Sequence, residues 1–492
     1  MNINNAAEIS KGALKDAAKA RYQKERIAHW NRVSKSKANA VRLGSYYHKL
    51  LQHYYKSLIP PGMRILELGC CHGDLLAALK PSFGVGVDFS VEMLRLAVKR
   101  HTDLFFILAD AHELPINTKF DVVILSDLLN DLWDVQGVLE KLQALTHPRT
   151  RFVLNFYNNF WHLPLSLVKR LGLGADLLEQ NWFAPHDVFN LLELAGFEVI
   201  NYRPFILLPL NVPVVSNLAN RYLVNFPPFC WLALTNFVIA RTQPMQHKTL
   251  SAKDISVSII IPARNESGNI ENIFRRIPRL GKDTEIIFVE GNSRDNTYET
   301  IVEMMMRFPE RQARVFRQAD CGKGNAVRLG FKEAKGDALI ILDADLTVPP
   351  EELPRFVEVL VSGRGEFING VRLVYPLENQ SMRFLNMVGN KLFSLAFSWL
   401  LGQPIKDTLC GTKVLWKSDY ETIAKNRHYF GNFDPFGDFD LLFGAARLNF
   451  KIADLPVRYR SRTYGDTNID RWRHGLLLLK MVLFAAIRIK FI

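Results

Sequence analysis

Two aspartates, Asp343 and Asp345, stand one residue apart in the stretch "ALIILDADLTVPPEEL". The apolar residues before them indicate a buried strand, and side chains alternate along a strand, so both carboxylates point the same way at its end. Two like charges side by side are unfavourable unless a cation lies between them. Hard oxygen ligands at the carboxyl end of a strand suit a divalent cation that neutralises a nucleotide diphosphate. The spacing therefore predicts a metal and nucleotide site.

Three further motifs supply groups that such a site needs. The stretch "CGKGNAVRLG" places Lys323 between two glycines at a helix start, where backbone N–H groups and a cation meet phosphate. The stretch "VSIIIPARNES" is a strand and loop with Asn265 and Glu266. The stretch "FVEGNSRDNT" follows the next strand with Glu290 and Asp295. These motifs predict that several strand ends converge on one nucleotide-sugar donor.

Together these blocks resemble the glycosyltransferase family 2 enzymes over nearly all of 256–470, and most closely the dolichyl- or polyprenyl-phosphate sugar synthases such as dolichol-phosphate mannose synthase. The downstream blocks "INGVR", "DTLCGTKVL", "FGDFDLLFGA" and "LPVRYRSRTYGDTNI" follow the order of that family. The resemblance implies a GT-A (nucleotide-diphospho-sugar transferase) fold. It also implies metal-dependent, inverting transfer of a sugar from a nucleotide-sugar to a polyprenyl phosphate.

The resemblance assigns roles to residues of this chain. It implies donor binding by Pro262, Asn265, Glu266, Glu290, Lys323 and Asp343. It implies that acceptor phosphate is bound by Arg372, Arg383, Arg460 and Arg462. Mg²⁺ or Mn²⁺ would be held by Asp343, Asp345 and Thr347, where Thr347 replaces a glutamine that is frequent in such synthases. The catalytic set is Asp343, Asp345, Asp440 and Arg462.

The nature of the acceptor decides whether a base is needed. A lipid phosphate is already an anion at neutral pH and can attack without one, so arginines have only to align it. A sugar hydroxyl requires a general base, for which Asp440 is the candidate, and this alternative stays open. A third possibility is a scaffold of two inactive nucleotide-binding domains.

A second set of motifs lies in the N-terminal half. The stretch "ILELGCCHGD" gives a strand, a tight turn with Gly69 and Gly73, and a helix start. Glu67 ends this strand, Asp88 ends the next one, and Asp110 follows the third. An acid about 20 residues after a glycine-rich turn is well placed to accept hydrogen bonds from ribose hydroxyls. The pattern predicts a nucleoside site.

These residues resemble the class I S-adenosylmethionine-dependent methyltransferases over about residues 30–205, with Cys71 where that family usually has its middle glycine. The resemblance implies S-adenosylmethionine binding by Glu67, Gly69, Gly73, Asp88 and Asp110. No catalytic base stands out. Three possible pocket residues are Asp127, Asn130 and His186. A degenerate module that binds the cofactor without catalysis is the alternative.

The motifs sit in two series of alternating strands and helices, which predict two α/β domains with parallel sheets. The expected fold is a Rossmann-like methyltransferase domain plus a GT-A domain with amphipathic interfacial helices at 381–401 and 472–490. In 381–401 polar residues recur every fourth position, which suits a core or a membrane interface. The predicted domains are a basic lead-in at 1–57, the methyltransferase at 58–240, a linker at 241–254, the glycosyltransferase at 255–470 and an interfacial helix at 471–492. The stretch 203–240 is apolar and is not assigned.

The composition limits the class of protein. Of 492 residues, 48% are hydrophobic and the formal net charge is +13. Residues 1–56 hold 12 Lys and Arg against three Asp and Glu, and the last 42 hold nine against three. Basic ends suit an anionic membrane surface, and no nucleic-acid partner is expected. Five cysteines without ligand spacing indicate a reducing compartment, and no signal peptide or run of about 18 apolar residues is found. We expect a bifunctional enzyme, peripheral on the cytoplasmic side of the cell membrane.

Overall fold

The computed structural model describes residues 3–35, 41–170, 178–244, 250–320, 322–372, 374–375, 384–427, 439–460, 462, 464 and 471–492. The chain divides into two compact units. The first is Met1–Gln243 with Phe491–Ile492, and the second is Pro244–Lys490.

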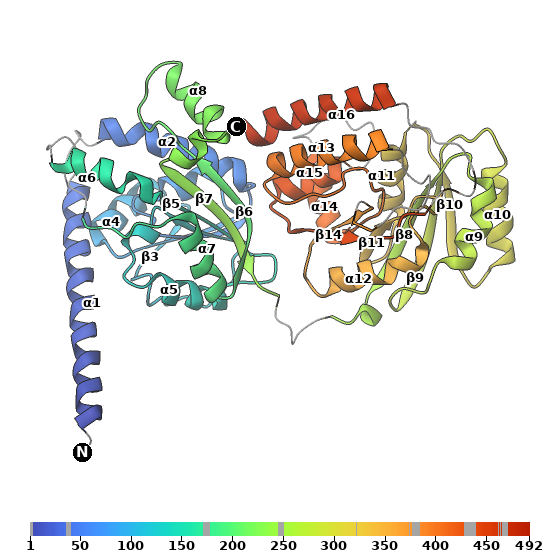
Figure 1. Ribbon diagram of the computed structural model, residues 1–492. Coiled ribbons are helices and arrows are strands. Elements are labelled where there is room, and N and C mark those ends of the chain that lie inside the picture. Colours follow the sequence, from blue (N-terminus) through green and yellow to red (C-terminus); the bar gives the residue numbers. More distant parts are fainter. Residues whose placement is uncertain are drawn as a thin grey trace. The chain divides into compact units, whose positions relative to one another are not determined.

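A seven-stranded sheet, counted over the described residues, forms the centre of the first unit in the order β3-β2-β1-β4-β5-β7-β6 (Figure 1). Its strands are β1 (Arg64–Leu68), β2 (Phe83–Asp88), β3 (Phe105–Leu108), β4 (Val122–Ser126), β5 (Arg151–Tyr157), β6 (Phe197–Phe205) and β7 (Thr235–Thr242). The first five are parallel, whereas β7 runs antiparallel to both β5 and β6. The expected all-parallel sheet is therefore wrong at this edge. The reason is that the unassigned stretch 203–240 contains β7, which returns directly beside β6.

Helices cover this sheet on both faces. They are α1 (Ile3–Lys35), α2 (Val41–Leu58), α3 (Asp74–Ala78), α4 (Val91–Arg100), α5 (Val135–Leu142), α6 (His162–Arg170), α7 (Pro185–Leu194) and α8 (Val215–Arg221). Helix α2 shows why they pack: Leu51, Tyr55 and Leu58 recur at helical spacing and are buried against the sheet. The order of strands reverses between β1 and β4, and in open α/β sheets ligands bind outside the carboxyl ends at such a point.

The second unit also has a mixed seven-stranded sheet among the described residues, in the order β10-β9-β8-β11-β13-β12-β14. Its strands are β8 (Ser256–Ala263), β9 (Asp283–Glu290), β10 (Gln312–Arg317), β11 (Ala338–Ile341), β12 (Phe367–Val371), β13 (Lys413–Trp416) and β14 (Ile452–Pro456). Strand β13 runs antiparallel to β11 and β12, so the parallel expectation is wrong here as well. Strands β8, β9 and β11, which carry the predicted donor motifs, are parallel neighbours.

The helices of the second unit are α9 (Ser267–Arg276), α10 (Thr297–Arg307), α11 (Lys323–Glu333), α12 (Leu353–Val361), α13 (Phe384–Leu401), α14 (Lys417–Lys425), α15 (Phe439–Arg447) and α16 (Arg471–Ala485). A π-helical turn, Ala486–Lys490, follows α16. One large apolar cluster, from Ile255 to Val457, fills the space between the sheet and its covering helices. The strand ends are therefore held by a rigid core.

Helix α13 buries its polar side and exposes its apolar side, the reverse of a helix that faces water. Its polar residues Asn390 and Ser394 are buried, at 3% and 2% exposed. Ser394 Oγ donates to the carbonyl oxygens of Asn390 and Lys406. The apolar residues Leu392 and Leu395 are 62% and 60% exposed. The polar stripe therefore faces inward and the apolar stripe outward.

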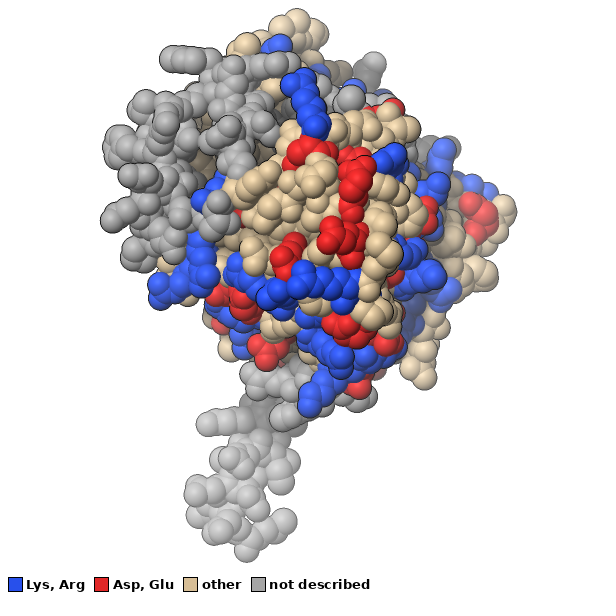
Figure 2. Space-filling model, turned by 90° about the vertical axis from the view of Figure 1, so that its right-hand side faces the viewer, with Lys and Arg blue, Asp and Glu red and all other residues tan. Residues whose placement is uncertain are grey.

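None of the described helices is long and apolar enough to cross a membrane. On the face drawn in Figure 2, basic and acidic side chains are interspersed.

Candidate active sites

The paired aspartates lie directly after β11, and each faces a cation. Lys323 Nζ, at the start of α11, is 2.6 Å from Asp343 Oδ1. Arg462 Nη2 is 2.7 Å from Asp345 Oδ2. Burial opposes ionisation of Asp343, but Lys323 outweighs it and lowers the pKa of that carboxyl. The negative charge of each aspartate is thus neutralised by a basic side chain that the sequence motifs had assigned to the same site.

Thr347 acts on Asp345 directly. Its Oγ1 donates to Asp345 Oδ1 at 2.8 Å, and its backbone N–H donates to the same oxygen at 3.1 Å. Thr347 is 4% exposed. Gly411 approaches from the other side, where a Cβ would overlap the Asp343 carboxylate. The orientation of both carboxylates is therefore fixed before any ligand arrives.

Glu266 is a third carboxyl group of this site. Burial raises its pKa to about 7, and the neighbouring charges of Asp345 and Asp343 act in the same direction. Its side chain accepts a hydrogen bond from Asn269 Nδ2 at 2.6 Å. A negative field of this kind at one point is what a divalent cation or a guanidinium relieves.

The loops after β8 and β9 are tied together beside these carboxylates. Asn265 Oδ1 accepts from the backbone N–H of Arg294 at 2.8 Å, and the Asn265 N–H donates to Ser293 Oγ at 3.1 Å. Glu290 is buried, and the Ser293 N–H donates to its Oε1 at 2.5 Å. Pro262 lies near the end of β8. Asn265 and Glu290 therefore shape the loops at the predicted donor site.

The predicted acceptor arginines fall in different environments. Arg372 is buried and its Nε and Nη2 donate to the two oxygens of Asp407 at 2.7 and 2.9 Å. Burial opposes the charge of Arg372, but Asp407 outweighs it and raises its pKa. A phosphate at Arg372 would have to share this guanidinium with Asp407. Arg460 is exposed, and its backbone N–H donates to Thr347 O at 2.9 Å, beside the aspartates. Arg383 lies outside the described residues.

Asp440, at the start of α15, lies between two guanidinium groups. Its Oδ2 is 3.3 Å from Arg328 Nη1 and 3.3 Å from Arg427 Nη2. It is 8% exposed. The carboxylate of Asp440 is thus engaged by two basic side chains.

The donor set fits a hard divalent cation in part. Asp343 and Asp345 supply carboxylate oxygens of the type that Mg²⁺ and Mn²⁺ prefer. Within the described residues, no group of three or more His, Cys, Asp and Glu side chains is arranged to hold a metal. The missing ligands suit substrate phosphate oxygens and water, which Mg²⁺ normally keeps.

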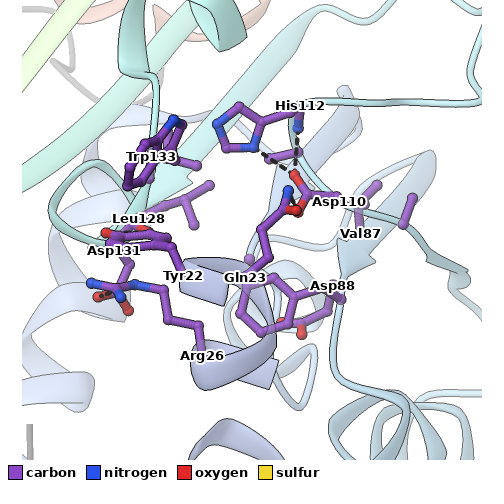
Figure 3. A pocket seen from close by; sticks show the side chains of 15 residues that line it. Tyr22, Gln23, Arg26, Val87, Asp88, Asp110, His112, Leu128, Asp131 and Trp133 are labelled. Carbon is purple, nitrogen blue, oxygen red and sulfur yellow. Dashed lines mark hydrogen bonds and ion pairs between the residues drawn. The ribbon is translucent and has the colours of Figure 1, made fainter. Parts of the chain in front are cut away.

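A pocket in the first unit opens at the carboxyl ends of β1, β2 and β4 (Figure 3). It is lined by Tyr22, Gln23, Arg26, Gly69, Val87, Asp88, Phe89, Ala109, Asp110, Ala111, His112, Leu128, Asp131, Leu132 and Trp133. Three of the five predicted cofactor residues, Gly69, Asp88 and Asp110, are in this lining. The sequence prediction thus converges on one cavity.

Asp88 holds the glycine-rich turn in place. Its Oδ2 accepts from the Cys71 N–H at 2.9 Å and its Oδ1 from the Ser90 N–H at 2.8 Å. Gly69 and Gly73 have φ of 70° and 72°, values that favour glycine, and Cys71 has φ 45°. A Cβ on Gly73 would lie 2.8 Å from the Phe106 ring. Gly73 is therefore required by the turn and is not among the lining residues.

Glu67 is the last residue but one of β1, is 3% exposed and is not among the lining residues. Burial raises its pKa to about 8, a hydrogen bond from the Leu76 backbone lowers it, and the charge of Asp88 raises it further. Asp110 differs: burial opposes its charge, but hydrogen bonds from His112 prevail and lower its pKa. His112 Nδ1 is 2.6 Å from Asp110 Oδ1.

Helix α1 supplies one wall of the pocket, which the sequence analysis missed (Figure 3). Gln23 Nε2 donates to Asp110 Oδ2 at 2.8 Å. Tyr22 meets Trp133 edge to face at 5.0 Å between ring centroids. Arg26 Nε is 3.7 Å from Asp131 Oδ1. The available signal was the spacing of these three residues on one side of a helix, which the basic composition of the segment obscured.

Asp127 follows β4 and is held by a polar cluster. Its Oδ1 accepts from Tyr47 Oη at 2.9 Å and from Asn155 Nδ2. Burial raises the pKa of Asp127 to about 7, although hydrogen bonds from Tyr47 and Asn155 lower it. Of the other two possible pocket residues, Asn130 is buried and donates to Asn181 O at 2.6 Å. His186 is exposed on α7 and is not in the lining.

Both halves match known families. Residues 258–423 match the glycosyl transferase family 2 model, and residues 59–182 match a methyltransferase domain model. The chain therefore contains an N-terminal methyltransferase domain and a C-terminal family 2 glycosyltransferase domain. The second of these domains resembles dolichol-phosphate mannosyltransferase.

Two curated relatives are similar to part of the chain. The chain is 40% identical over 237 residues to the dolichol-phosphate mannosyltransferase of Pyrococcus furiosus. The aligned region covers 46% of this chain and 64% of that relative. The chain is 36% identical over 230 residues to the undecaprenyl-phosphate 4-deoxy-4-formamido-L-arabinose transferase of Pseudomonas aeruginosa, again covering 46% and 64%. The chain thus spans somewhat less than two thirds of the length of these relatives.

Solved structures give distant likenesses. Glucosyl-3-phosphoglycerate synthase from Mycobacterium tuberculosis, in complex with Mn²⁺ and uridine diphosphate, has a TM-score of 0.35 at 19% identity, covering 48% of this chain and 80% of the other. A methyltransferase from Mesorhizobium loti has a TM-score of 0.31 at 21% identity, covering 38% and 96%.

Proposed function

We propose that this protein is a bifunctional enzyme that transfers a sugar from a nucleotide-sugar to a polyprenyl phosphate and carries a fused S-adenosylmethionine-dependent methyltransferase. The observation that carries the first activity is the pairing of Lys323 with Asp343 and of Arg462 with Asp345. Carboxylates that could bind a metal ion and basic side chains that could bind phosphate therefore lie together at the end of one strand. The relatives that act on dolichol phosphate and undecaprenyl phosphate support the lipid acceptor.

The donor would bind at the ends of β8, β9 and β11. Asp343 and Asp345 would hold Mg²⁺ or Mn²⁺, which neutralises charge on the diphosphate leaving group. Thr347 orients Asp345 through its hydroxyl hydrogen bond, so we assign it to positioning as well as to the predicted metal set. Lys323, at the N-terminus of α11, is placed to meet phosphate oxygens.

The acceptor needs no base on this proposal. An oxygen of the lipid phosphate attacks the anomeric carbon, the bond from that carbon to the donor phosphate breaks, and the nucleoside diphosphate leaves. A single displacement inverts the anomeric centre. Arg462, which faces Asp345, and Arg460, whose backbone bonds Thr347, would bind the acceptor phosphate, whereas Arg372 is engaged by Asp407.

The outward apolar faces of α13 and α16 support a membrane acceptor. Leu392 and Leu395 are exposed on α13, and Leu476, Leu483 and Ile487 are 56%, 57% and 61% exposed on α16 and the turn after it. Apolar residues flanked by cations such as Lys480 and Arg488 suit the interface of an anionic bilayer. We therefore place the enzyme peripherally on the cytoplasmic face of the cell membrane.

For the first unit, Asp88, Asp110 and Gly69 line the cavity that would receive the nucleoside part of S-adenosylmethionine. The cofactor supplies an electrophilic methyl group. The chain has to bind it and align an acceptor. The fusion suggests that one glycolipid product receives both a sugar and a methyl group.

The test incubates the purified chain with a panel of labelled nucleotide-sugars, Mn²⁺ and a polyprenyl phosphate, and measures labelled lipid. We expect Asp345→Asn to lower the rate at least about 100-fold, because charge on the leaving group is then uncompensated. Asp320→Asn, at an exposed aspartate of the same domain, is the control and keeps the rate. Lipid product that survives Asp345→Asn contradicts the metal site.

The alternative transfers sugar to a sugar hydroxyl, with Asp440 as base. Product on water-soluble acceptors, with none on the lipid, would establish it. The methyltransferase is tested separately by equilibrium binding of labelled S-adenosylmethionine. Asp88→Ala loses binding, and Asp103→Ala, at an exposed aspartate, keeps it.

A further inference from the structure

The segment of chain that joins β6 to β7, which includes α8, projects from the first unit (Figure 1). It consists of α8, the 3₁₀ turns Leu223–Asn225 and Phe229–Leu232, and the loop before α8. Its exposed large apolar residues are Leu210, Val212, Val214, Val215, Leu218, Tyr222, Leu223, Phe226, Phe229 and Trp231. Val214 and Trp231 are 72% and 68% exposed. We call these ten residues the α8 surface. Exposed apolar patches of this kind mark interaction sites.

The polar residues of the same segment point inward. Asn220 is 4% exposed; its Oδ1 accepts from the N–H groups of Leu207 and Leu208, both at 2.8 Å, and its Nδ2 donates to Leu208 O at 2.8 Å. Ser216 is 2% exposed, and its Oγ accepts from the Val212 N–H at 2.9 Å. A helix that faces water places Ser and Asn outward, so α8 is inverted. The internal hydrogen bonds hold the apolar residues in place.

The charges along this stretch of sequence favour one kind of partner. The sequence has no Asp or Glu between Glu198 and Asp254, whereas Arg221 lies on α8 itself. A protein partner does not require such an absence, but the negative surface potential of anionic lipid repels carboxylates and attracts arginine. Tyr222 and Trp231 are of the types enriched where a membrane meets water.

We propose that the α8 surface docks the methyltransferase unit on an anionic phospholipid bilayer. The C-terminal Phe491 lies at one edge of this surface, where its carbonyl oxygen accepts a hydrogen bond from Arg221 Nε at 3.1 Å and its ring meets that of Tyr222. The α8 surface fits a methyl acceptor that is carried by a lipid, and that part rests on the proposed function. The docking itself does not, because it is argued from α8 alone.

Vesicle binding of the full chain tests the docking. Vesicles with about 30 mol % phosphatidylglycerol in phosphatidylcholine present the anionic surface. We expect the double variant Val214→Glu, Leu218→Glu to lower the partition coefficient about tenfold, because two charges replace apolar residues at the interface. The matched control is Val98→Glu, Leu194→Glu, at residues 53% and 60% exposed elsewhere on the unit, and it leaves partitioning unchanged.

Hydrogen exchange on the unaltered chain gives a second readout. Vesicles should slow backbone exchange in 206–232 and leave the α4 segment, 91–100, unaffected. Equal partitioning of the two double variants, or vesicle binding without protection in 206–232, overturns the proposal. Protection that grows with protein concentration and needs no vesicles assigns the surface to a second copy of the chain and overturns it too. If the α8 variant still transfers sugar, the proposed glycosyltransferase activity stands whatever the outcome of the vesicle experiment. Failure of the docking proposal can therefore be told apart from failure of the proposed function.

Discussion

Glu67, which the sequence predicts to bind the cofactor, is a buried acid whose ionisation opposes folding. Its side chain is buried at the end of β1, and burial raises its pKa to about 8. An acid with a raised pKa in the folded state binds more protons folded than unfolded. The stability it contributes is present at low pH and is lost as the pH rises toward 8. A positive group that binds nearby would favour the ionised form.

We therefore expect Glu67→Gln to flatten the pH dependence of stability. In the unaltered chain the free energy of unfolding of the first unit should fall by up to about 1.4 kcal/mol per pH unit from this group between pH 5 and 8. Glutamine keeps the acceptor for the Leu76 N–H and removes the titration. Urea denaturation at pH 5, 6.5 and 8 measures the difference between the two proteins. Glu113→Gln, at an exposed glutamate, is the control, and an equal slope in wild type and Glu67→Gln would refute the expectation.

At the second site, Thr347 gives a sharper test than the aspartates themselves. Its hydroxyl donates to Asp345 Oδ1 at 2.8 Å. We expect Thr347→Val to weaken Mn²⁺ binding about tenfold, since Asp345 loses a hydrogen bond that orients it. Thr347→Ser keeps the hydroxyl and should stay near wild type. Mn²⁺ binding in the presence of a nucleoside diphosphate, followed by electron paramagnetic resonance, measures this. Equal affinity of the Val and Ser variants would show that the hydroxyl has no role.

Among the elements, α1 is the one whose role changes most. The sequence left the role of this basic segment open, and in the structure Tyr22, Gln23 and Arg26 line the pocket of the first unit. Tyr22 packs on Trp133 at the pocket wall, and Arg26 lies with its guanidinium 3.5 Å from the Tyr22 ring centroid. A helix in this position forms one aromatic wall of the pocket.

We expect Tyr22→Ala to raise the dissociation constant of S-adenosylhomocysteine about tenfold, mainly through faster dissociation, because one aromatic wall is lost. Arg21→Ala is the matched control: the side chain of Arg21 is 83% exposed on the same helix. Calorimetry gives the affinity and stopped-flow fluorescence gives the rate. Unchanged affinity in Tyr22→Ala would mean that α1 covers the pocket without contributing to binding.

The elements also show what the sequence could and could not predict. Strands β1 and β11 were predictable because each is rich in apolar residues and is followed within two residues by a glycine or an acid, and β8 because it contains the apolar run Ile259–Ile261. The antiparallel strands β7 and β13 were not, since an apolar run does not reveal the direction of its neighbour. Periodicity identified α13 as amphipathic but not which side faces inward. The inward side is set by partners distant in sequence, such as Asp407, which accepts from Asn390 Nδ2 at 2.9 Å.

The same limit applies to the sites. Asp343, Asp345 and Lys323 were found by local motifs, and the structure brings them together. The partner of Arg372 was not predictable, because Asp407 is 35 residues away and the two meet only through the fold. The wall formed by α1 could not be predicted either, because Gln23 reaches Asp110 across 87 residues.

At the scale of the whole molecule, each unit has its own sheet and its own apolar core. The clusters around Leu66 and Tyr54 belong to the first unit, and the cluster around Ile259 belongs to the second. Because each unit has its own core, we expect each to unfold in its own cooperative transition. A ligand then raises the midpoint only of the unit whose folded state binds it.

We expect differential scanning calorimetry of the full chain to show two transitions. S-adenosylhomocysteine at about 100 times its dissociation constant should stabilise one unit by about 2.7 kcal/mol and raise the midpoint of that transition alone. A nucleoside diphosphate with Mn²⁺ should raise only the other midpoint. The variants assign each transition: Asp88→Ala abolishes the first shift and Asp345→Asn the second, each without affecting the other. A single transition that both ligands raise would show that the two units unfold as one, so that a ligand of either unit stabilises both.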